Sequence, residues 1–372
     1  MFSVFKTQNK PICSQVFRKF RMIQKISIQL NLYANIIIKL SDCLTSFQYK
    51  RFGISNQLVT LIIVLSLINT SQALAQDSVD KLFNRAYHYL SVDRQKAISL
   101  LSDCINQNAE FTDAYFHRGI AYFKEGKYDS ALHDFKTVER QNPDRSIIWM
   151  YKGFTYRNQG NIEEALASFS NYISLNPTDT SAYSYILRGK VKYELGDFEG
   201  AVSDYDMAMK LEPFEEKYQY YRFIALFEAE QFKQALEAVD RLIEINDNFY
   251  GYYFYKGNVY LEMNDFNNAI YMYNVAILKN YNNADSYYKR ATAYLALDKY
   301  GKALEDYNTA IVLKPNDGTF YSHRGNCKFE MGKKSAACAD WNEAGALGYY
   351  EDFDKMKQVC EGLNSTSDSE GK

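Results

Sequence analysis

The sequence predicts an all-α protein made of about eight copies of a helix–turn–helix unit, because three markers recur in register. The first is a series of alanines spaced 34 residues apart, with one step of 36. The second is the spacing of four of the five prolines, which follows the same period. The third is a small residue, usually glycine, twelve positions before most of these alanines. The alanines are Ala97, Ala131, Ala165, Ala201, Ala235, Ala269, Ala303 and Ala337.

Within one period, the apolar pattern indicates two helices. Large residues recur seven positions apart over residues 115–122, with Gly119 between them, which marks one face of a first helix. Gly126 indicates a turn, and residues 128–138 have the apolar spacing of a second helix that Pro143 ends. Small residues on these faces predict that the two helices approach closely.

The pattern resembles the tetratricopeptide repeat. Two consecutive units carry the family's positions: Tyr115, Gly119, Tyr122, Ala131, Phe135 and Pro143, then Trp149, Gly153, Tyr156, Ala165, Phe169 and Pro177. The resemblance implies a right-handed solenoid over residues 76–348, in which each repeat contacts only its neighbours. Residues 349–362 are expected to form a C-terminal capping helix, followed by a disordered tail at 363–372.

The fifth repeat departs from the pattern at three positions. Phe223 replaces the small residue, Ala238 stands where an aspartate is expected, and Asp247 replaces the terminal proline. A large side chain between the helices should hold them further apart. We therefore expect the array to open or bend near residues 214–247.

The first 75 residues read as a targeting segment. An apolar run, Leu58–Ile68, follows Lys50 and Arg51 and precedes small residues that end at Ala75, the order found in secretory signal peptides. We expect export to the periplasm or the extracellular space after cleavage near Ala75, with no stable membrane span in the mature chain. The alternatives are a buried helix or a membrane anchor formed by Leu58–Ile68.

Charge and motif content exclude several function classes. Residues 76–372 carry a net charge of −10, which opposes binding to a phosphate backbone, so no nucleic-acid partner is expected. The four histidines are scattered, and no metal, phosphate-loop, dinucleotide or nucleophile motif is found. The chain is therefore expected to have no catalytic residues, no metal and no cofactor.

A basic residue precedes the small residue in seven repeats, and an aspartate stands sixteen positions later in four of them. Every one of these aspartates falls in a repeat with arginine, whose planar guanidinium fits a carboxylate better than lysine does. We predict structural ion pairs between the two helices of a repeat; the alternative is a ligand-binding stripe. The pairs are Arg118–Asp134, Arg188–Asp204, Arg290–Asp306 and Arg324–Asp340.

The cysteines divide into core positions and a candidate disulfide. Cys104 and Cys327 align with small apolar residues of other repeats, whereas Cys338 lies on the face that would pack against the terminal helix bearing Cys360. An exported protein favours a Cys338–Cys360 disulfide. Pairing of Cys327 instead, or free thiols throughout, remain the alternatives.

The resemblance also places a binding groove on the first helix of each repeat, at positions three before, one after and four after the small residue. These positions are mostly aromatic or aliphatic: Phe116, Ile120, Phe123, Met150, Phe154, Ile186, Tyr193, Tyr220, Ile224, Phe227, Phe254, Leu261 and Tyr288. The resemblance implies a non-catalytic scaffold that binds peptide or helix segments of partner proteins there. Alternatively, the strip is buried by a tight superhelix or by a homo-oligomer contact, or the chain is a structural or accessory subunit of an envelope or secretion assembly that uses its lateral surfaces.

Overall fold

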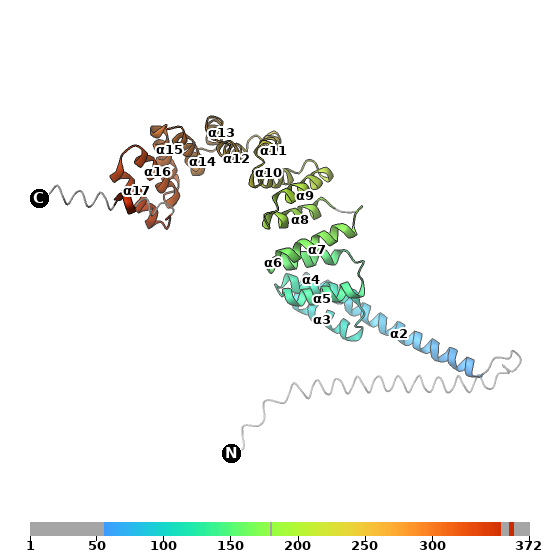
Figure 1. Ribbon diagram of the computed structural model, residues 1–372. Coiled ribbons are helices and arrows are strands. Elements are labelled where there is room, and N and C mark those ends of the chain that lie inside the picture. Colours follow the sequence, from blue (N-terminus) through green and yellow to red (C-terminus); the bar gives the residue numbers. More distant parts are fainter. Residues whose placement is uncertain (1–55, 179–180, 351–356, 361–372) are drawn as a thin grey trace, which may run out of the picture. The chain divides into compact units, whose positions relative to one another are not determined.

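The computed structural model describes residues 56–178, 181–350 and 357–360, and within them it contains helices and no strands (Figure 1). The all-α prediction is therefore confirmed. The chain divides into two compact units, Met1–Ala121 and Tyr122–Lys372. Residues 1–55, which belong to the predicted N-terminal extension and signal peptide at 1–75, and the predicted tail at 363–372 lie outside the described residues.

The first unit is built on one long helix, α2 (Asn56–Tyr89), which packs on α3 (Arg94–Gln107). Asp93 begins α3, and its side chain accepts a hydrogen bond from the Lys96 backbone N–H at 3.0 Å, as expected of an N-cap. The start of α4 (Thr112–Lys124) completes the unit. Its buried cluster consists of Val79, Ala86, Leu101, Cys104 and Ala114.

The apolar part of α2 differs from the part that packs. Leu61, Val64, Leu65 and Ile68 are 42–53% exposed, whereas Val79 and Ala86 are buried. Among the described helices, α2 included, none combines the length and apolarity needed to cross a bilayer.

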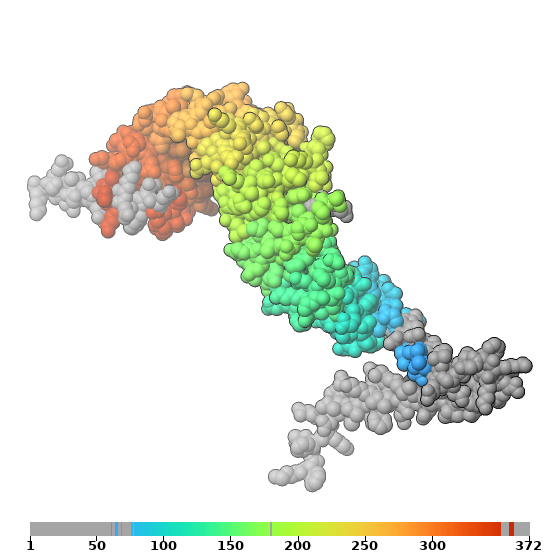
Figure 2. All heavy atoms as spheres, turned by 45° about the vertical axis from the view of Figure 1, so that its right-hand side comes forward, coloured from blue at the N-terminus to red at the C-terminus, as the bar shows by residue number. Residues whose placement is uncertain are grey.

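The second unit continues with helix pairs in chain order (Figures 1 and 2). From α6 onward, each first helix packs on its own second helix, and that second helix packs on the first helix of the next repeat. This is the predicted nearest-neighbour arrangement of a repeat protein. The helices are α5 (Tyr128–Gln141), α6 (Ile147–Asn158), α7 (Ile162–Leu175), α8 (Ala182–Glu194), α9 (Phe198–Leu211), α10 (Glu216–Glu228), α11 (Phe232–Ile245), α12 (Tyr250–Glu262), α13 (Phe266–Lys279), α14 (Ala284–Ala296), α15 (Tyr300–Leu313), α16 (Gly318–Glu330) and α17 (Lys334–Ala346).

The helices of one repeat meet where a small residue faces a large ring. A Cβ atom added to Gly153, Gly189, Gly257 or Gly325 would lie 2.5–2.8 Å from an aromatic ring of the second helix, closer than real Cβ contacts. The four rings are those of Phe169, Tyr205, Tyr273 and Trp341. The ring always comes sixteen residues after the glycine, so this pairing accounts for the small-residue column of the sequence.

In the fifth repeat, the large residue lies on the first helix and the smaller one on the second helix. Phe223 occupies the small position, and Val239, sixteen residues later, replaces the aromatic ring; both are buried in one cluster. A large residue on the first helix is expected to hold α10 and α11 further apart than the helices of the other repeats. The core is nevertheless filled, because the volume has moved from one helix to the other. The expected opening or bending of the array near residues 214–247 stays a prediction.

The turn inside each repeat requires a left-handed backbone. Gly126, Gly160, Gly196 and Gly332 have φ between 71° and 81°, and the equivalent residues of the three repeats between them are Glu230, Asn264 and Asp298, with φ of 56–58°. Glycine adopts this conformation without the steric cost that a Cβ brings.

We expect Glu230→Gly to raise the stability of the fifth repeat by about 1 kcal/mol, since the substitution removes a Cβ from a left-handed position. Asn264→Gly should gain less, because asparagine tolerates this conformation better than glutamate. Gly196→Ala is the reverse control and should lower stability by about 1 kcal/mol. Urea unfolding measures all three, and a destabilised Glu230→Gly variant would contradict the assignment.

Candidate functional site

The predicted groove side chains that remain partly exposed in the structure form one surface, the first-helix face. Phe116 and Ile186 do not contribute to it, because they are only 6% and 1% exposed. Position three before the small residue turns toward the core in these two repeats; Ile186, for example, packs with Ala201 and Tyr205. The other predicted groove residues are half-buried: Ile120, Phe123, Met150, Phe154, Tyr193, Tyr220, Ile224, Phe227, Phe254, Leu261 and Tyr288.

Aromatic rings of successive first helices touch within the second unit. The rings of Phe123 and Phe154 have centroids 6.4 Å apart. Those of Tyr220 and Tyr255 are 5.7 Å apart, and their hydroxyl oxygens are separated by 3.3 Å. These contacts join α4 to α6 and α10 to α12. The first-helix face is therefore continuous from one repeat to the next at these places.

The position four after the small residue also packs on its own turn. The ring centroid of Phe227 lies 6.0 Å from that of Phe232, the first residue of the second helix. The ring centroids of Tyr193 and Phe198 are 5.3 Å apart in the equivalent place of the fourth repeat. Each ring thus packs on its own hairpin and is still partly exposed. Rings held in this way lose little side-chain entropy when a ligand covers them.

Polar residues on this face have structural partners. Asn258 Oδ1 accepts a hydrogen bond from Tyr273 Oη at 2.9 Å, and Asn326 Oδ1 accepts one from Trp341 Nε1 at 3.2 Å. Thr292 and Tyr307 have hydroxyl oxygens 3.4 Å apart. Each polar residue directly follows the small residue and satisfies the buried ring of its own repeat.

Comparing two repeat positions would have found these bonds in the sequence. Where the ring is Tyr273 or Trp341, the residue after the glycine is polar; where the ring is Phe169, that residue is Phe154, whose own ring lies 5.5 Å from it. Burial raises the pKa of the Tyr273 and Tyr307 hydroxyls, so both stay protonated and able to donate.

Three of the four predicted arginine–aspartate pairs are present. Arg188 donates from Nε and Nη2 to the two carboxylate oxygens of Asp204 at 2.9 and 2.6 Å. Two further pairs have the same two-bond geometry at 2.7–2.8 Å, Arg290–Asp306 and Arg324–Asp340. Arg118 and Asp134 belong to different units, and their pairing stays a prediction.

The basic column has a second set of partners that sequence reasoning missed. Arg290 Nη1 donates to Asn274 Oδ1 at 2.6 Å, and Arg222 Nε donates to Asp206 Oδ1 at 2.6 Å. These partners lie sixteen residues before the basic residue, on the second helix of the preceding repeat. Lys256, which lacks an aspartate in its own repeat, pairs with Asp240 in the same manner. The column therefore ties neighbouring repeats together, which favours its structural interpretation over a ligand-binding stripe.

We expect Arg188→Lys to lower the free energy of unfolding by about 1 kcal/mol, because lysine cannot reproduce the two parallel hydrogen bonds to Asp204. Asp204→Asn should cost about 1–3 kcal/mol, since Asp204 is buried and also pairs with Lys192 at 3.0 Å. The double variant should lose less than the sum of the two. Urea unfolding of all three variants tests the pair, and additive losses would show that the residues act independently.

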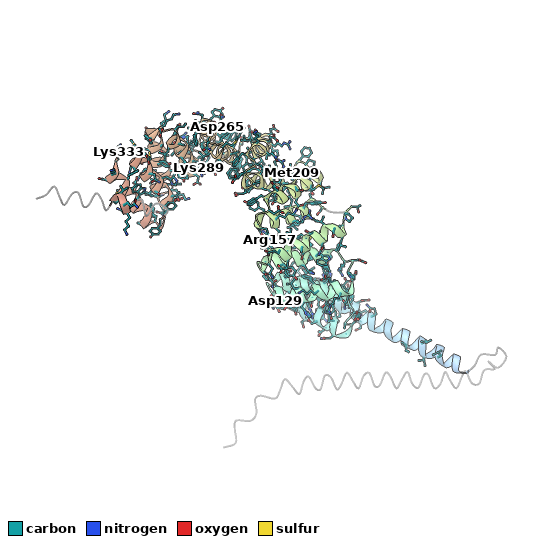
Figure 3. The ribbon with its side chains drawn as sticks, viewed as in Figure 1. Asp129, Arg157, Met209, Asp265, Lys289 and Lys333 are labelled. Carbon is teal, nitrogen blue, oxygen red and sulfur yellow. A yellow bond between two sulfur atoms is a disulfide. The ribbon has the colours of Figure 1, made fainter. Side chains whose placement is uncertain are left out.

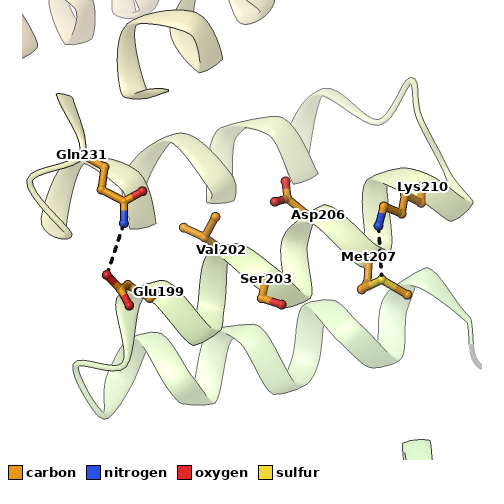
Figure 4. A pocket seen from close by; sticks show the side chains of 7 residues that line it. All are labelled: Glu199, Val202, Ser203, Asp206, Met207, Lys210 and Gln231. Carbon is orange, nitrogen blue, oxygen red and sulfur yellow. Dashed lines mark hydrogen bonds between the residues drawn. The ribbon is translucent and has the colours of Figure 1, made fainter. Parts of the chain in front are cut away.

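Two depressions lie on second helices. One, of about 310 Å³, is lined along α9 by Glu199, Val202, Ser203, Asp206, Met207 and Lys210, with Gln231 (Figure 4). The other, of about 810 Å³, is lined by His133, Lys136, Glu139, Arg140, Pro143 and Lys152. Neither contains a residue of the predicted groove. Among the described residues, no group of His, Cys, Asp or Glu is placed to hold a metal ion.

The structure distinguishes between the cysteine alternatives. Cys338 and Cys360 form a disulfide with Cα atoms 5.9 Å apart, while Cys104 and Cys327 are buried free thiols. Burial raises the pKa of the Cys104 thiol to about 11, and burial also raises the pKa of Cys327. Both thiols therefore remain protonated and poorly nucleophilic at neutral pH. Cys360 belongs to a helical segment at 357–360, inside the predicted capping helix, whereas Tyr349 and Tyr350 are not helical.

Comparisons with known proteins agree with this architecture. Two segments, residues 116–180 and 284–317, match family models described as tetratricopeptide repeat. No curated protein matches the chain significantly. A tetratricopeptide repeat protein from Parabacteroides merdae is 20% identical in sequence, with a TM-score of 0.50 over 67% of this chain and 97% of that one. The C-terminal part of a repeat-containing protein from Cytophaga hutchinsonii is 18% identical, with a TM-score of 0.55 over 64% and 97%.

At such low identities the solved structures establish the fold alone. The two matched segments add the family's own sequence pattern, in the same register as the 34-residue period. Sequence pattern, helix pairing and structural likeness together identify the chain as a tetratricopeptide repeat protein.

Proposed function

We propose that this protein is a non-catalytic interaction scaffold whose first-helix face binds extended or helical segments of partner proteins. The observation that carries the proposal is the chain of half-buried rings in contact across repeats, Phe123 with Phe154 and Tyr220 with Tyr255. Repeat solenoids use such extended surfaces for binding. Partly exposed aromatic rings that are already held in place are typical binding hot spots.

Affinity purification from the native compartment tests this proposal with a variant confined to the face. Ile224→Ser with Phe227→Ser should lose the partners that the unchanged protein retains, because both side chains are half-buried residues of α10. A matched control, Leu278→Ser with Val312→Ser, changes two apolar residues on second helices. Circular dichroism must show that each variant is folded. Partners that survive the α10 changes and disappear in the control would overturn the proposal.

One observation favours the alternative, a structural or accessory subunit that uses lateral surfaces. Leu278 and Val312 are 84% and 80% exposed, and they occupy the same repeat position on α13 and α15. Large apolar side chains exposed in neighbouring repeats are typical of contact surfaces. In this case Leu278→Ser with Val312→Ser, and not the α10 variant, would abolish assembly.

We also propose that the protein is exported, with cleavage near Ala75. In support, the described buried cluster of the first repeat, from Val79 to Ala114, lies after Ala75 and would remain in the cleaved chain. The Cys338–Cys360 disulfide also fits an oxidising compartment. N-terminal sequencing of the protein from each cell fraction should find a start close to Gln76. A chain that retains Leu58–Ile68 and sediments with membranes would instead establish the anchor alternative.

A further inference from the structure

The acidic excess of the repeat region is confined to its middle. Residues 194–265 contain sixteen acidic and six basic side chains, whereas the rest of residues 76–372 is balanced. This stretch runs from the end of α8 to the turn before α13. It contains the part of the first-helix face formed by Tyr220, Phe227 and Leu261, and Tyr193 directly precedes it.

Three glutamates stand in one repeat position along this stretch. Glu194, Glu228 and Glu262 are the last residues of α8, α10 and α12, 34 residues apart, and all three are exposed. Each directly follows a residue of the first-helix face. The glutamates therefore form a row along the edge of the aromatic surface.

One member of the row shows what the position can bind. Glu194 pairs with Arg157, whose Nε lies 3.1 Å from both carboxylate oxygens and whose Nη2 also donates to Oε1 (Figure 3 labels Arg157). Arg157 is a first-helix residue of the preceding repeat, four positions after Gly153. The carboxylate thus reaches over the face of the neighbouring repeat and holds a guanidinium there.

The other two glutamates have no such arginine. Tyr193 occupies the position equivalent to Arg157 in front of Glu228, and Phe227 occupies it in front of Glu262. Burial, and after it the charge of Glu228, raises the pKa of Tyr193, which places this carboxylate close to the face. No ion-pair partner of Glu228 or Glu262 is found in the part of the chain that the structure describes.

We propose that the first-helix face of α8, α10 and α12 binds a partner segment bearing arginine or lysine side chains, which pair with Glu228 and Glu262 as Arg157 pairs with Glu194. This inference rests on the proposed function and specifies the partner's chemistry. The aromatic residues beside the row cover the apolar residues of the segment. Charge complementarity then determines which segments bind and in which register.

The geometry also sets the spacing of the basic residues. Helices α10 and α12 touch through Tyr220 and Tyr255, and packed helices lie roughly 8–10 Å apart. A segment in the polyproline II conformation advances about 3.1 Å per residue and completes one turn every three residues. Basic residues three positions apart in such a segment therefore lie on one side and match consecutive glutamates, and the apolar residues between them contact the rings beside the row.

A random 12-residue peptide library displayed on phage is the probe. The purified protein should enrich peptides with Arg or Lys at positions i and i+3, separated by apolar residues. Synthetic copies of the enriched peptides should bind at least tenfold more weakly to Glu228→Gln/Glu262→Gln. Citrulline, which keeps the shape of arginine without its charge, should cause a similar loss when it replaces arginine in the peptide.

Two pairs of variants separate specific pairing from general acidity. Glu237→Gln/Glu244→Gln removes two exposed charges from α11 and should leave binding within twofold. Arg157→Ala frees Glu194 and should tighten binding of peptides with a third basic residue, whereas Lys233→Ala, which removes an equal charge from α11, should not. Glu228→Arg/Glu262→Arg should select acidic peptides instead.

The outcomes distinguish this inference from the function on which it rests. Enriched peptides without basic residues, whose binding Phe227→Ser abolishes, would overturn the charge assignment and leave the peptide-binding face intact. Equal losses in the α10/α12 and α11 charge variants would also overturn it, because binding would then depend on net charge alone. Failure to enrich any peptide would contradict both proposals.

Discussion

Replacing Phe223 with alanine is expected to destabilise the fifth repeat by about 3–5 kcal/mol, the usual cost of truncating a buried phenylalanine. Phe223 is buried in one cluster with Val239, and its ring centroid lies 5.6 Å from that of Tyr255, so truncation leaves a cavity that the small Val239 cannot fill. Because a repeat array does not unfold in one step, hydrogen exchange of amides in α10 and α11 is the appropriate measurement. Phe214→Ala makes the same change at a 93% exposed position and should stay within about 0.5 kcal/mol.

A second substitution tests whether the large side chain of Phe223 replaces the aromatic ring that other repeats carry at the position of Val239. Val239→Phe added to Phe223→Ala recreates the arrangement of Gly153 with Phe169 and should recover more than half of the lost stability. Val239→Phe alone should cost about 1–3 kcal/mol, because it overfills the same space. If the double variant is as unstable as the sum of the single ones, the exchange does not explain how this repeat packs.

The Cys338→Ser/Cys360→Ser variant, which lacks the disulfide, is expected to lower the free energy of unfolding of the last repeat by about 3 kcal/mol. The bond closes a loop of 22 residues, and its loss returns that entropy to the unfolded chain. It also ties Val359 and Cys360 to the cluster of Ala337, Cys338 and Trp341. Hydrogen exchange in α16 and α17 should therefore accelerate about a hundredfold, which corresponds to ~3 kcal/mol.

The effect should be local, since each repeat contacts only its neighbours. Amides of α6 and α7 should exchange at unchanged rates, and Cys327→Ala, which removes a free thiol from the core of the seventh and eighth repeats, serves as the chemical control. A loss under 0.5 kcal/mol, or one spread equally over the array, would show that the disulfide does not cap the terminal repeat.

Some features of the site could be predicted from the sequence of a single repeat. The Arg188–Asp204 pair was predictable because both residues lie in one hairpin, whose geometry the period repeats. The Cys338–Cys360 bond was one of the alternatives, because Cys338 lies on the face that would pack against the terminal helix bearing Cys360. The partner of Arg222 was not predictable in this way, because Asp206 belongs to the preceding repeat and only stacking brings the two together.

Sequence alone determined the helix pairs, their register and the position of the first-helix face, because helix periodicity and turn residues act over a few neighbouring positions. The tertiary structure alone decided which of those face residues remain accessible. Phe116 and Ile186 carry the same pattern as Tyr220, yet they are buried. Their burial depends on how closely helices of adjacent repeats approach, and this follows from the volumes of side chains on several helices at once. For the same reason the sequence did not show that the row of Glu194, Glu228 and Glu262 can bind a guanidinium. The ion pair of Glu194 with Arg157 depends on the stacking of two repeats.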